Sequence, residues 1–133
     1  MFFYRETPSG QNSDSYFSNV SLLLRGNEEA QPVTVNDPIK DDSNNDFAIT
    51  KYGDAKISNT VYKYGTSSLS FDGNGDYLTA PNNNSFSFGT GDFTMECWTY
   101  VTSFGNPPVF IDTRNTSGGA GICLLCNGSG YVT

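Results

Sequence analysis

The sequence contains no histidine, and only seven of its 133 residues are lysine or arginine. Without histidine, a serine or cysteine nucleophile would lack its usual general base. The few basic residues are scattered along the chain, and the formal net charge is −7. Because binding to nucleic acid needs a basic surface that releases counterions from phosphates, we expect no nucleic-acid partner.

Long hydrophobic runs are also missing. The longest apolar stretches, such as Leu22–Leu24 and Ile122–Cys126, cover only a few residues. A bilayer-spanning helix needs a far longer run, so we expect no membrane insertion. The segment Met1–Gly10 lacks the basic start and apolar stretch of a signal peptide. The sequence therefore predicts a protein that stays in the producing cell or leaves it by assembly and lysis, as virion proteins do.

Cysteine is scarce, with Cys97, Cys123 and Cys126 as its only instances. An odd number leaves at least one thiol unpaired in a monomer. Cys123 and Cys126 have the CxxC spacing, but residues three apart on a strand point to opposite faces. Neither a second CxxC nor a histidine is present to complete a zinc site. We expect reduced thiols that pack as small apolar side chains.

The abundant residues are aromatic or turn-forming. Ten phenylalanines and eight tyrosines lie in short runs of alternating polarity, separated by loops of glycine, asparagine, aspartate and serine. Such runs favour β-strands and leave no room for a helix of useful length. A chain of this size can bury roughly two-thirds of its unfolded surface. The sequence thus predicts one all-β domain, an antiparallel sandwich of about nine short strands.

The pattern places the expected strands along the chain. They are residues 19–25, 47–51, 55–58, 68–71, 77–79, 93–101, 109–112, 122–126 and 131–132, with a short edge strand at 33–35. Gly53 and Asp54 are expected to join the second and third strands as a hairpin. Residues 93–101 form the clearest strand, and because both of its faces are largely apolar we expect it in the centre of a sheet.

Residues 1–16 form a separate region, with the aromatic cluster Phe2–Tyr4 followed by a polar stretch. One interpretation is a frayed terminus. The other is an N-terminal arm whose aromatic tip docks on a neighbouring subunit, because exposed aromatic side chains are costly in water.

The order of motifs from Phe17 onward resembles the laminin-G-like branch of the concanavalin-A-like jelly rolls, including members borne by phages. The motifs that carry the resemblance are 17–24, 47–55, 63–69, Phe71-Asp72-Gly73, Asp76-Tyr77-Leu78 and 88–96 with Trp98. The resemblance implies an antiparallel jelly-roll sandwich over residues 17–133 and a binding or structural role. Cys97 stands where such proteins usually carry another apolar residue.

Proteins of this family generally continue for some dozens of residues beyond the point that corresponds to Thr133. The jelly roll is therefore expected to lack part of its usual C-terminal half. Three explanations stay open: a fragment, a reduced sandwich, or a sandwich completed by neighbouring chains through β-augmentation.

Two sets of side chains are candidates for binding. Asp72, Asn74 and Asp76 place oxygen-bearing side chains at alternate positions of a flexible loop, a pattern that suits Ca²⁺. Asp42, Asn44 and Asp46 repeat this spacing. The alternative is that aspartate, asparagine and glycine are simply what tight turns require.

The second set consists of aromatic and amide side chains near predicted loops, which together could hold a sugar. Its members are Tyr77, Asn82, Tyr100 and Asn106. The alternative is ordinary core or turn packing for each of them.

Catalysis is not expected. Glycoside hydrolysis needs two carboxyl groups flanking the scissile bond, and the clearest predicted strand offers Glu96 alone. The sequence therefore predicts a non-enzymatic module of a virion, a phage head decoration protein or a tail or fibre component. Its partners would be other virion proteins, copies of itself or host glycans, and calcium is the only cofactor suggested. The alternative is an extracellular carbohydrate-binding module of a larger bacterial surface protein or glycoside hydrolase.

Overall fold

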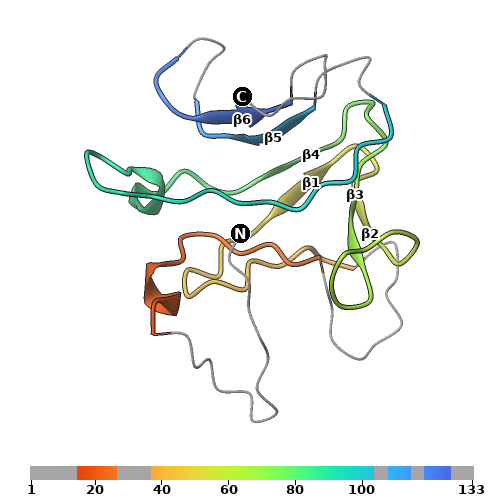
Figure 1. The fold of residues 1–133 in the computed structure, drawn as a ribbon, viewed down its shortest axis with the longest axis horizontal. Helices are drawn as coiled ribbons and strands as arrows, with labels where there is room; N and C mark the ends of the chain where they lie inside the picture. Colours follow the sequence, from red (N-terminus) through yellow and green to blue (C-terminus); the bar gives the residue numbers. More distant parts are fainter. Residues whose placement is uncertain (1–14, 27–36, 104–107, 115–118, 127–133) are drawn as a thin grey trace. The chain divides into compact units, whose positions relative to one another are not determined.

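The computed structural model describes residues 15–26, 37–103, 108–114 and 119–126. The chain divides into two compact units, residues 1–96 and 97–133. In the described part, strands three or four residues long form three antiparallel pairs, and the only helices are two single 3-10 turns (Figure 1). The all-β class is therefore confirmed. Each sheet has two strands, so the layered jelly roll over residues 17–133 stays a prediction.

Four strands of the first unit form one interrupted ribbon. Strand β1 (Thr50–Tyr52) pairs with β4 (Tyr77–Thr79), and β2 (Lys56–Ser58) pairs with β3 (Ser68–Ser70). Segments 50–58 and 68–79 thus run antiparallel to one another, with a break between the two ladders. At the break, residues 53–55 of one segment face residues 71–76 of the other. The longer side has to bulge outward as a loop.

The hairpin predicted at Gly53 and Asp54 is wrong. These residues do form a turn, with a φ of +68° at Gly53, but β1 and β2 do not pair with each other. The chain bends there and reverses later, between β2 and β3. The predicted strands 68–71 and 77–79 are confirmed, as is the loop between them.

The strand predicted at residues 19–25 is also wrong. A 3-10 turn, η1 (Phe17–Asn19), is followed by an irregular segment that buries Val20 and Leu23. This segment is bonded mainly to polar groups of residues 41–47 instead of to a strand ladder. Asp42 donates its N–H to Leu23 O at 2.9 Å, and Asn45 Nδ2 donates to Ser21 O at 2.9 Å. Alternating apolar residues predict burial correctly, but they do not specify the hydrogen-bond partner.

Asp41 lies at the centre of this attachment, with only 3% of its surface exposed. Its Oδ1 accepts hydrogen bonds from the N–H groups of Leu23 and Ser43, both at 2.9 Å. Its Oδ2 accepts from the Ser43 hydroxyl at 2.8 Å and from the Phe47 N–H at 3.0 Å. Burial alone would raise the pKa of Asp41. The four hydrogen bonds outweigh burial and hold the pKa below its ordinary value.

The remaining core of the first unit is small. Among its described residues, the buried hydrophobic ones are Val20, Leu23, Ile39, Ala55 and Ile57. Phe47 packs against Phe86 of η2 (Asn84–Phe86), with ring centroids 5.4 Å apart. The Ser21 hydroxyl donates to Ser85 O at 2.8 Å. Apolar packing and polar bonds therefore attach the same segments.

In the second unit, β5 (Val109–Asp112) pairs with β6 (Cys123–Leu125). The register shifts between Val109 and Ile111, which marks a β-bulge. The guanidinium of Arg114 hydrogen-bonds the Asp112 carboxylate and lowers its pKa to about 2. Both strands agree with the predictions at 109–112 and 122–126.

The three cysteines carry free thiols. Cys126 is buried, whereas Cys97 and Cys123 are half-buried. Burial raises the pKa of the Cys97 thiol. A raised pKa disfavours the reactive thiolate, in keeping with a packing role.

The central strand predicted at residues 93–101 is not found, because no residue of this segment belongs to a strand. Phe93, Trp98 and Tyr100 are about half or more exposed. Alternation of apolar and polar residues favours an extended chain but provides no neighbour to pair with. The strands predicted at 33–35 and 131–132, and residues 1–14 of the predicted arm, lie outside the described residues.

Replacing Asp41 is expected to destabilise the first unit. Asp41→Ala leaves three N–H groups and a hydroxyl without their acceptor, and we expect a loss of about 3 kcal/mol in the free energy of unfolding. Asp42→Ala is the matched control, because it removes a part-exposed ion pair with Arg25 and should cost under about 1 kcal/mol. Urea denaturation measures both variants. Equal losses would contradict the role assigned to Asp41.

The lowered pKa of Asp41 also predicts acid sensitivity. Since the unfolded carboxyl has a pKa of about 3.9, the unfolded state binds more protons than the folded state in acid. The stabilisation that the Asp41 carboxylate contributes is fully present above the unfolded-state pKa. It is lost as the pH falls through the lower pKa that Asp41 has in the folded state. Urea midpoints measured across this range should fall less steeply in Asp41→Ala than in the parent chain. Parallel curves would contradict the assignment.

Candidate functional site

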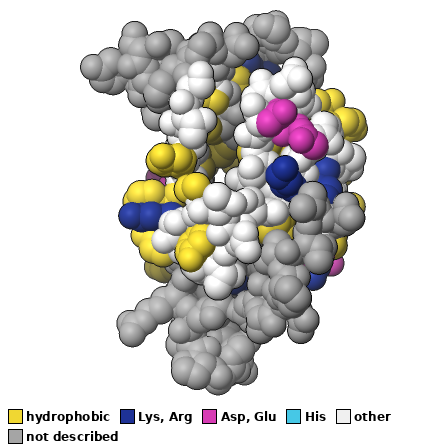
Figure 2. All heavy atoms as spheres, turned by 90° about the vertical axis from the view of Figure 1, so that its right-hand side faces the viewer, with side chains coloured by type: hydrophobic (Ala, Val, Ile, Leu, Met, Phe, Trp, Pro, Cys, Tyr) yellow, Lys and Arg dark blue, Asp and Glu magenta, His cyan; other side chains and the backbone are white. Residues whose placement is uncertain are grey.

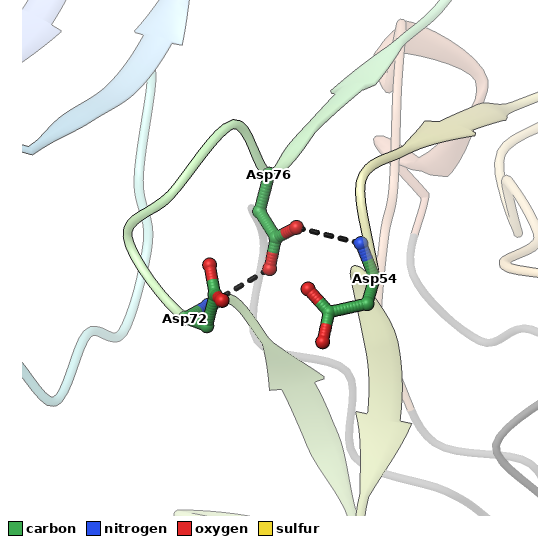
Figure 3. A group of neighbouring side chains, drawn as sticks. All are labelled: Asp54, Asp72 and Asp76. Carbon is green, nitrogen blue, oxygen red and sulfur yellow. Dashed lines mark hydrogen bonds between the residues drawn. The ribbon is translucent and has the colours of Figure 1, made fainter.

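Three carboxyl groups meet at the break between the two ladders of the first unit (Figure 3). Asp54 follows the bend after β1, while Asp72 and Asp76 begin and end the bulged loop between β3 and β4. One carboxylate oxygen from each lies within 4.8 Å of the others. The uneven lengths of the two facing segments thus bring together acids that are 22 residues or fewer apart in sequence.

Asp76 fastens the two segments to one another. Its Oδ1 accepts the Asp54 N–H at 2.8 Å, and its Oδ2 accepts the Asp72 N–H at 2.8 Å (Figure 3). We call this arrangement the Asp76 clamp. The hydrogen bond from the Asp72 amide, followed by that from Asp54, keeps the pKa of Asp76 below its ordinary value. The carboxylate takes the place of the ladder hydrogen bonds that are missing at the break.

Gly53 makes the Asp76 clamp possible. It adopts a left-handed φ of +68°, and a Cβ at this position would collide with Asp76 Oδ1. Any other residue would be strained in its backbone and would push the carboxylate away. The turn residue predicted from sequence therefore serves a long-range contact as well as a local bend.

The structure brings together two of the three predicted calcium ligands. Asp72 and Asp76 are neighbours, whereas Asn74 takes part through its backbone, donating its N–H to Asp72 Oδ1 at 2.7 Å. Asp54 was missed. It could have been found by pairing Tyr52 with Tyr77, which places the two loops opposite each other. The contacts explain Asp76 as a backbone clamp, and calcium binding stays a prediction.

The second stretch with alternating acids has a different arrangement. Asp42 pairs with Arg25 at 2.8 Å, and Asp46 adopts a left-handed φ of 46° in a turn. Asn45 and Ser43, the residues between the predicted oxygen ligands, hydrogen-bond the chain near Ser21. This stretch serves to attach the 20–26 segment.

A pair of tyrosines adjoins the Asp76 clamp. Tyr52 and Tyr77 face each other across β1 and β4, with ring centroids 4.3 Å apart and planes 7° from parallel. They are 42% and 51% exposed. Their cross-strand neighbours Thr50 and Thr79 are exposed on the same face, since side chains alternate along a strand. This tyrosine pair is an aromatic surface beside carboxylate oxygens.

The other predicted sugar-binding residues come from other parts of the chain. Asn82 is exposed in the segment after β4. Tyr100 is 75% exposed and belongs to the second unit, and Asn106 lies outside the described residues. Of the predicted sugar-binding residues that the structure describes, Tyr77 is the one that stacks on another aromatic ring.

Hydrophobic side chains reach the surface at several places on the face shown in Figure 2. On any face of the first unit, the large exposed hydrophobic residues include Tyr16, Val61, Tyr62, Tyr64, Phe71 and Phe93. Residues 61–64 belong to the connection between β2 and β3, where Lys63 Nζ lies 6.0 Å from the centroid of the Tyr64 ring. Within the described ranges, no helix has the length and apolar character needed to cross a membrane.

Comparison with known proteins adds no identification. No family model matches the chain, and searches of curated proteins and of solved structures find no match. Functional arguments therefore depend on the residues themselves.

The Asp76 clamp can be tested by removing its charge. Asp76→Asn replaces one accepting oxygen with a donating NH₂ group, so it cannot accept both backbone N–H groups. We expect faster hydrogen exchange at the amides of Asp54 and Asp72, measured by NMR. Asp54→Asn is the control, because the Asp54 side chain is not the acceptor of these two bonds. Unchanged exchange in Asp76→Asn would contradict the clamp.

Proposed function

We propose that this chain is a non-enzymatic structural or adhesion module of a virus particle, in the form of a phage head decoration protein or a tail or fibre component. The proposal rests on the resemblance to laminin-G-like jelly rolls, including those borne by phages. The observation that carries it is the combination of two-stranded sheets and exposed aromatic side chains in the described part.

Two-stranded ladders are an incomplete form of β-structure. An isolated pair of strands is marginally stable in water, and its outer edges offer unpaired N–H and C=O groups. Each of the three sheets has this form. Adjoining chains that add strands or cover faces would complete such a structure by β-augmentation.

The exposed aromatics favour the same function. Tyr100 is 75% exposed, and Phe93 and Trp98 of the preceding segment are about half exposed. Aromatic side chains are enriched where proteins meet one another, because they bury a large area with few rotatable bonds. Other particle proteins or further copies of this chain are the partners that we propose.

A catalytic function has less support. A hydrolytic pair needs one carboxyl group kept protonated as an acid, and Asp76 has the opposite property. The pKa of Asp76 is lowered by amide hydrogen bonds, so this group stays ionised. The proposed module acts by binding.

Glycan binding is the second candidate function, and the tyrosine pair favours it. A sugar ring can stack its apolar face on tyrosine while its hydroxyls donate to carboxylate oxygens. Tyr52 precedes Gly53 and Asp54, and Tyr77 follows Asp76, so both kinds of group are adjacent. Such a surface would serve host attachment by a virion, or the alternative of a carbohydrate-binding module in a larger bacterial protein.

The structural function is tested by measuring association. Light scattering on the purified chain, alone and with the other proteins of its particle, should show concentration-dependent complexes. Tyr100→Ser is expected to weaken them, because it removes a large exposed aromatic surface, whereas the exposed-site control Thr102→Ser should not. A monodisperse monomer under both conditions, with a cooperative thermal transition, would contradict this function.

Glycan binding is tested on an array of host-type glycans. Tyr77→Ala should weaken binding to any glycan retained by the parent chain by roughly tenfold, the effect of losing one stacking contact. Tyr64→Ala is the control, because this tyrosine is exposed on a different connection. If the parent chain binds no glycan on the array, glycan attachment is contradicted. The structural function is then tested by the association experiment alone.

A further inference from the structure

The tip of the bulged loop is an open stretch of backbone. Gly73 and Gly75 have φ values of +83° and +80°, and nothing lies within 4 Å of where a Cβ would stand on either. Asn74 between them is exposed. Its backbone N–H is bonded to Asp72 Oδ1, but within the described structure no hydrogen bond holds the Asn74 side-chain amide or the Gly75 N–H.

This arrangement is suited to an intramolecular reaction. An asparagine side-chain carbonyl can be attacked by the backbone nitrogen of the next residue, provided that the local backbone rotates to bring them together. Glycine permits this rotation better than any other residue, since it has no Cβ to obstruct the approach. We propose that Asn74 is a site of spontaneous deamidation, with Gly75 N as the nucleophile.

The reaction balances without a cofactor. Gly75 N loses its proton to solvent base and forms a bond to Asn74 Cγ. The bond from Cγ to the side-chain nitrogen breaks, and ammonia leaves with a proton from water. Water then opens the five-membered imide at either carbonyl, which yields aspartate or isoaspartate at position 74. The net change is the uptake of one water and the release of one ammonia.

Three other described asparagines of the first unit, Asn19, Asn45 and Asn83, are restrained. Asn45 Nδ2 donates to Ser21 O at 2.9 Å, and Asn83 Oδ1 accepts the Ser85 N–H at 2.9 Å. Asn19 precedes the β-branched Val20, which crowds the approach of the nitrogen. The open loop and the following glycine therefore distinguish Asn74.

The neighbouring Asp72-Gly73 pair has the same spacing but a less reactive side chain. Asp72 Oδ1 accepts the Asn74 N–H at 2.7 Å. A carboxylate is a poorer electrophile than an amide. Isomerisation at Asp72 should therefore be slower than deamidation at Asn74.

The product would alter the acidic break. Deamidation adds a negative charge to a loop whose ends already hold Asp72 and Asp76 near Asp54. Like charges repel at this range, and isoaspartate also inserts a methylene into the backbone. Both changes weaken the Asp76 clamp, so Asn74 is a position at which the protein changes with age.

The experiment incubates the full chain under mildly alkaline conditions and follows each asparagine by peptide mapping with mass spectrometry and isoaspartate-specific methylation. We expect Asn74 to react about tenfold faster than Asn45 or Asn83, as the freedom of glycine and the open loop require. Peptide mapping separates Asn74 from the other Asn-Gly pair, Asn127-Gly128, which lies outside the described residues.

Two comparisons make the result decisive. Asn74→Gln should abolish the reaction at this position and leave the rates at Asn45 and Asn83 unchanged. Incubation in urea should change the rate at Asn74 by less than it changes the rate at Asn45, because the folded loop already allows the attack. A rate at Asn74 equal to that at Asn45 in the folded chain, or one that rises only on unfolding, would overturn the proposal.

Discussion

The buried carboxylate of Asp41 is the interaction on which the first unit depends. A charge with 3% exposure is tolerable only because four donors, from Leu23, Ser43 and Phe47, converge on its two oxygens. These bonds join a segment without strand pairing to the turn before β1. They also orient Leu23 and Phe47, whose apolar side chains pack in the same region. The polar centre and the small hydrophobic core thus share Leu23.

A carboxylate accepts backbone N–H groups in the same way at two other places. Asp76 accepts two backbone N–H groups at the break in the ribbon, and Asp112 accepts the Arg114 N–H where β5 ends. In each case a carboxylate satisfies backbone donors that a short strand leaves unpaired. This gives a physical reason for the acidic composition, because much of the negative charge near these turns is structural.

The sequence predicted the local features that depend on short-range chemistry. Strands β3 to β6, the loop from Asp72 to Asp76 and the turn at Gly53 follow from alternation and from residues that tolerate a positive φ. Which strands pair with each other could not be predicted, since a turn-forming sequence does not distinguish a bend in the chain from a reversal of its direction. Asp41 was not predicted as a core residue, because a buried acid becomes recognisable only once its donors are located. For the same reason Asp54 was absent from the predicted site.

The break in the ribbon has a consequence for how this region can vary. The ladder of β1 with β4 and the ladder of β2 with β3 each have their own register, and residues 53–55 and 71–76 absorb the difference between them. A slip in an uninterrupted sheet would turn every side chain to the opposite face. Here, inserted or deleted residues at the loop tip would leave both alignments intact as long as Gly53 and Asp76 remain. The loop is therefore the natural location for length differences among descendants of this gene, and for grafted peptides in engineering.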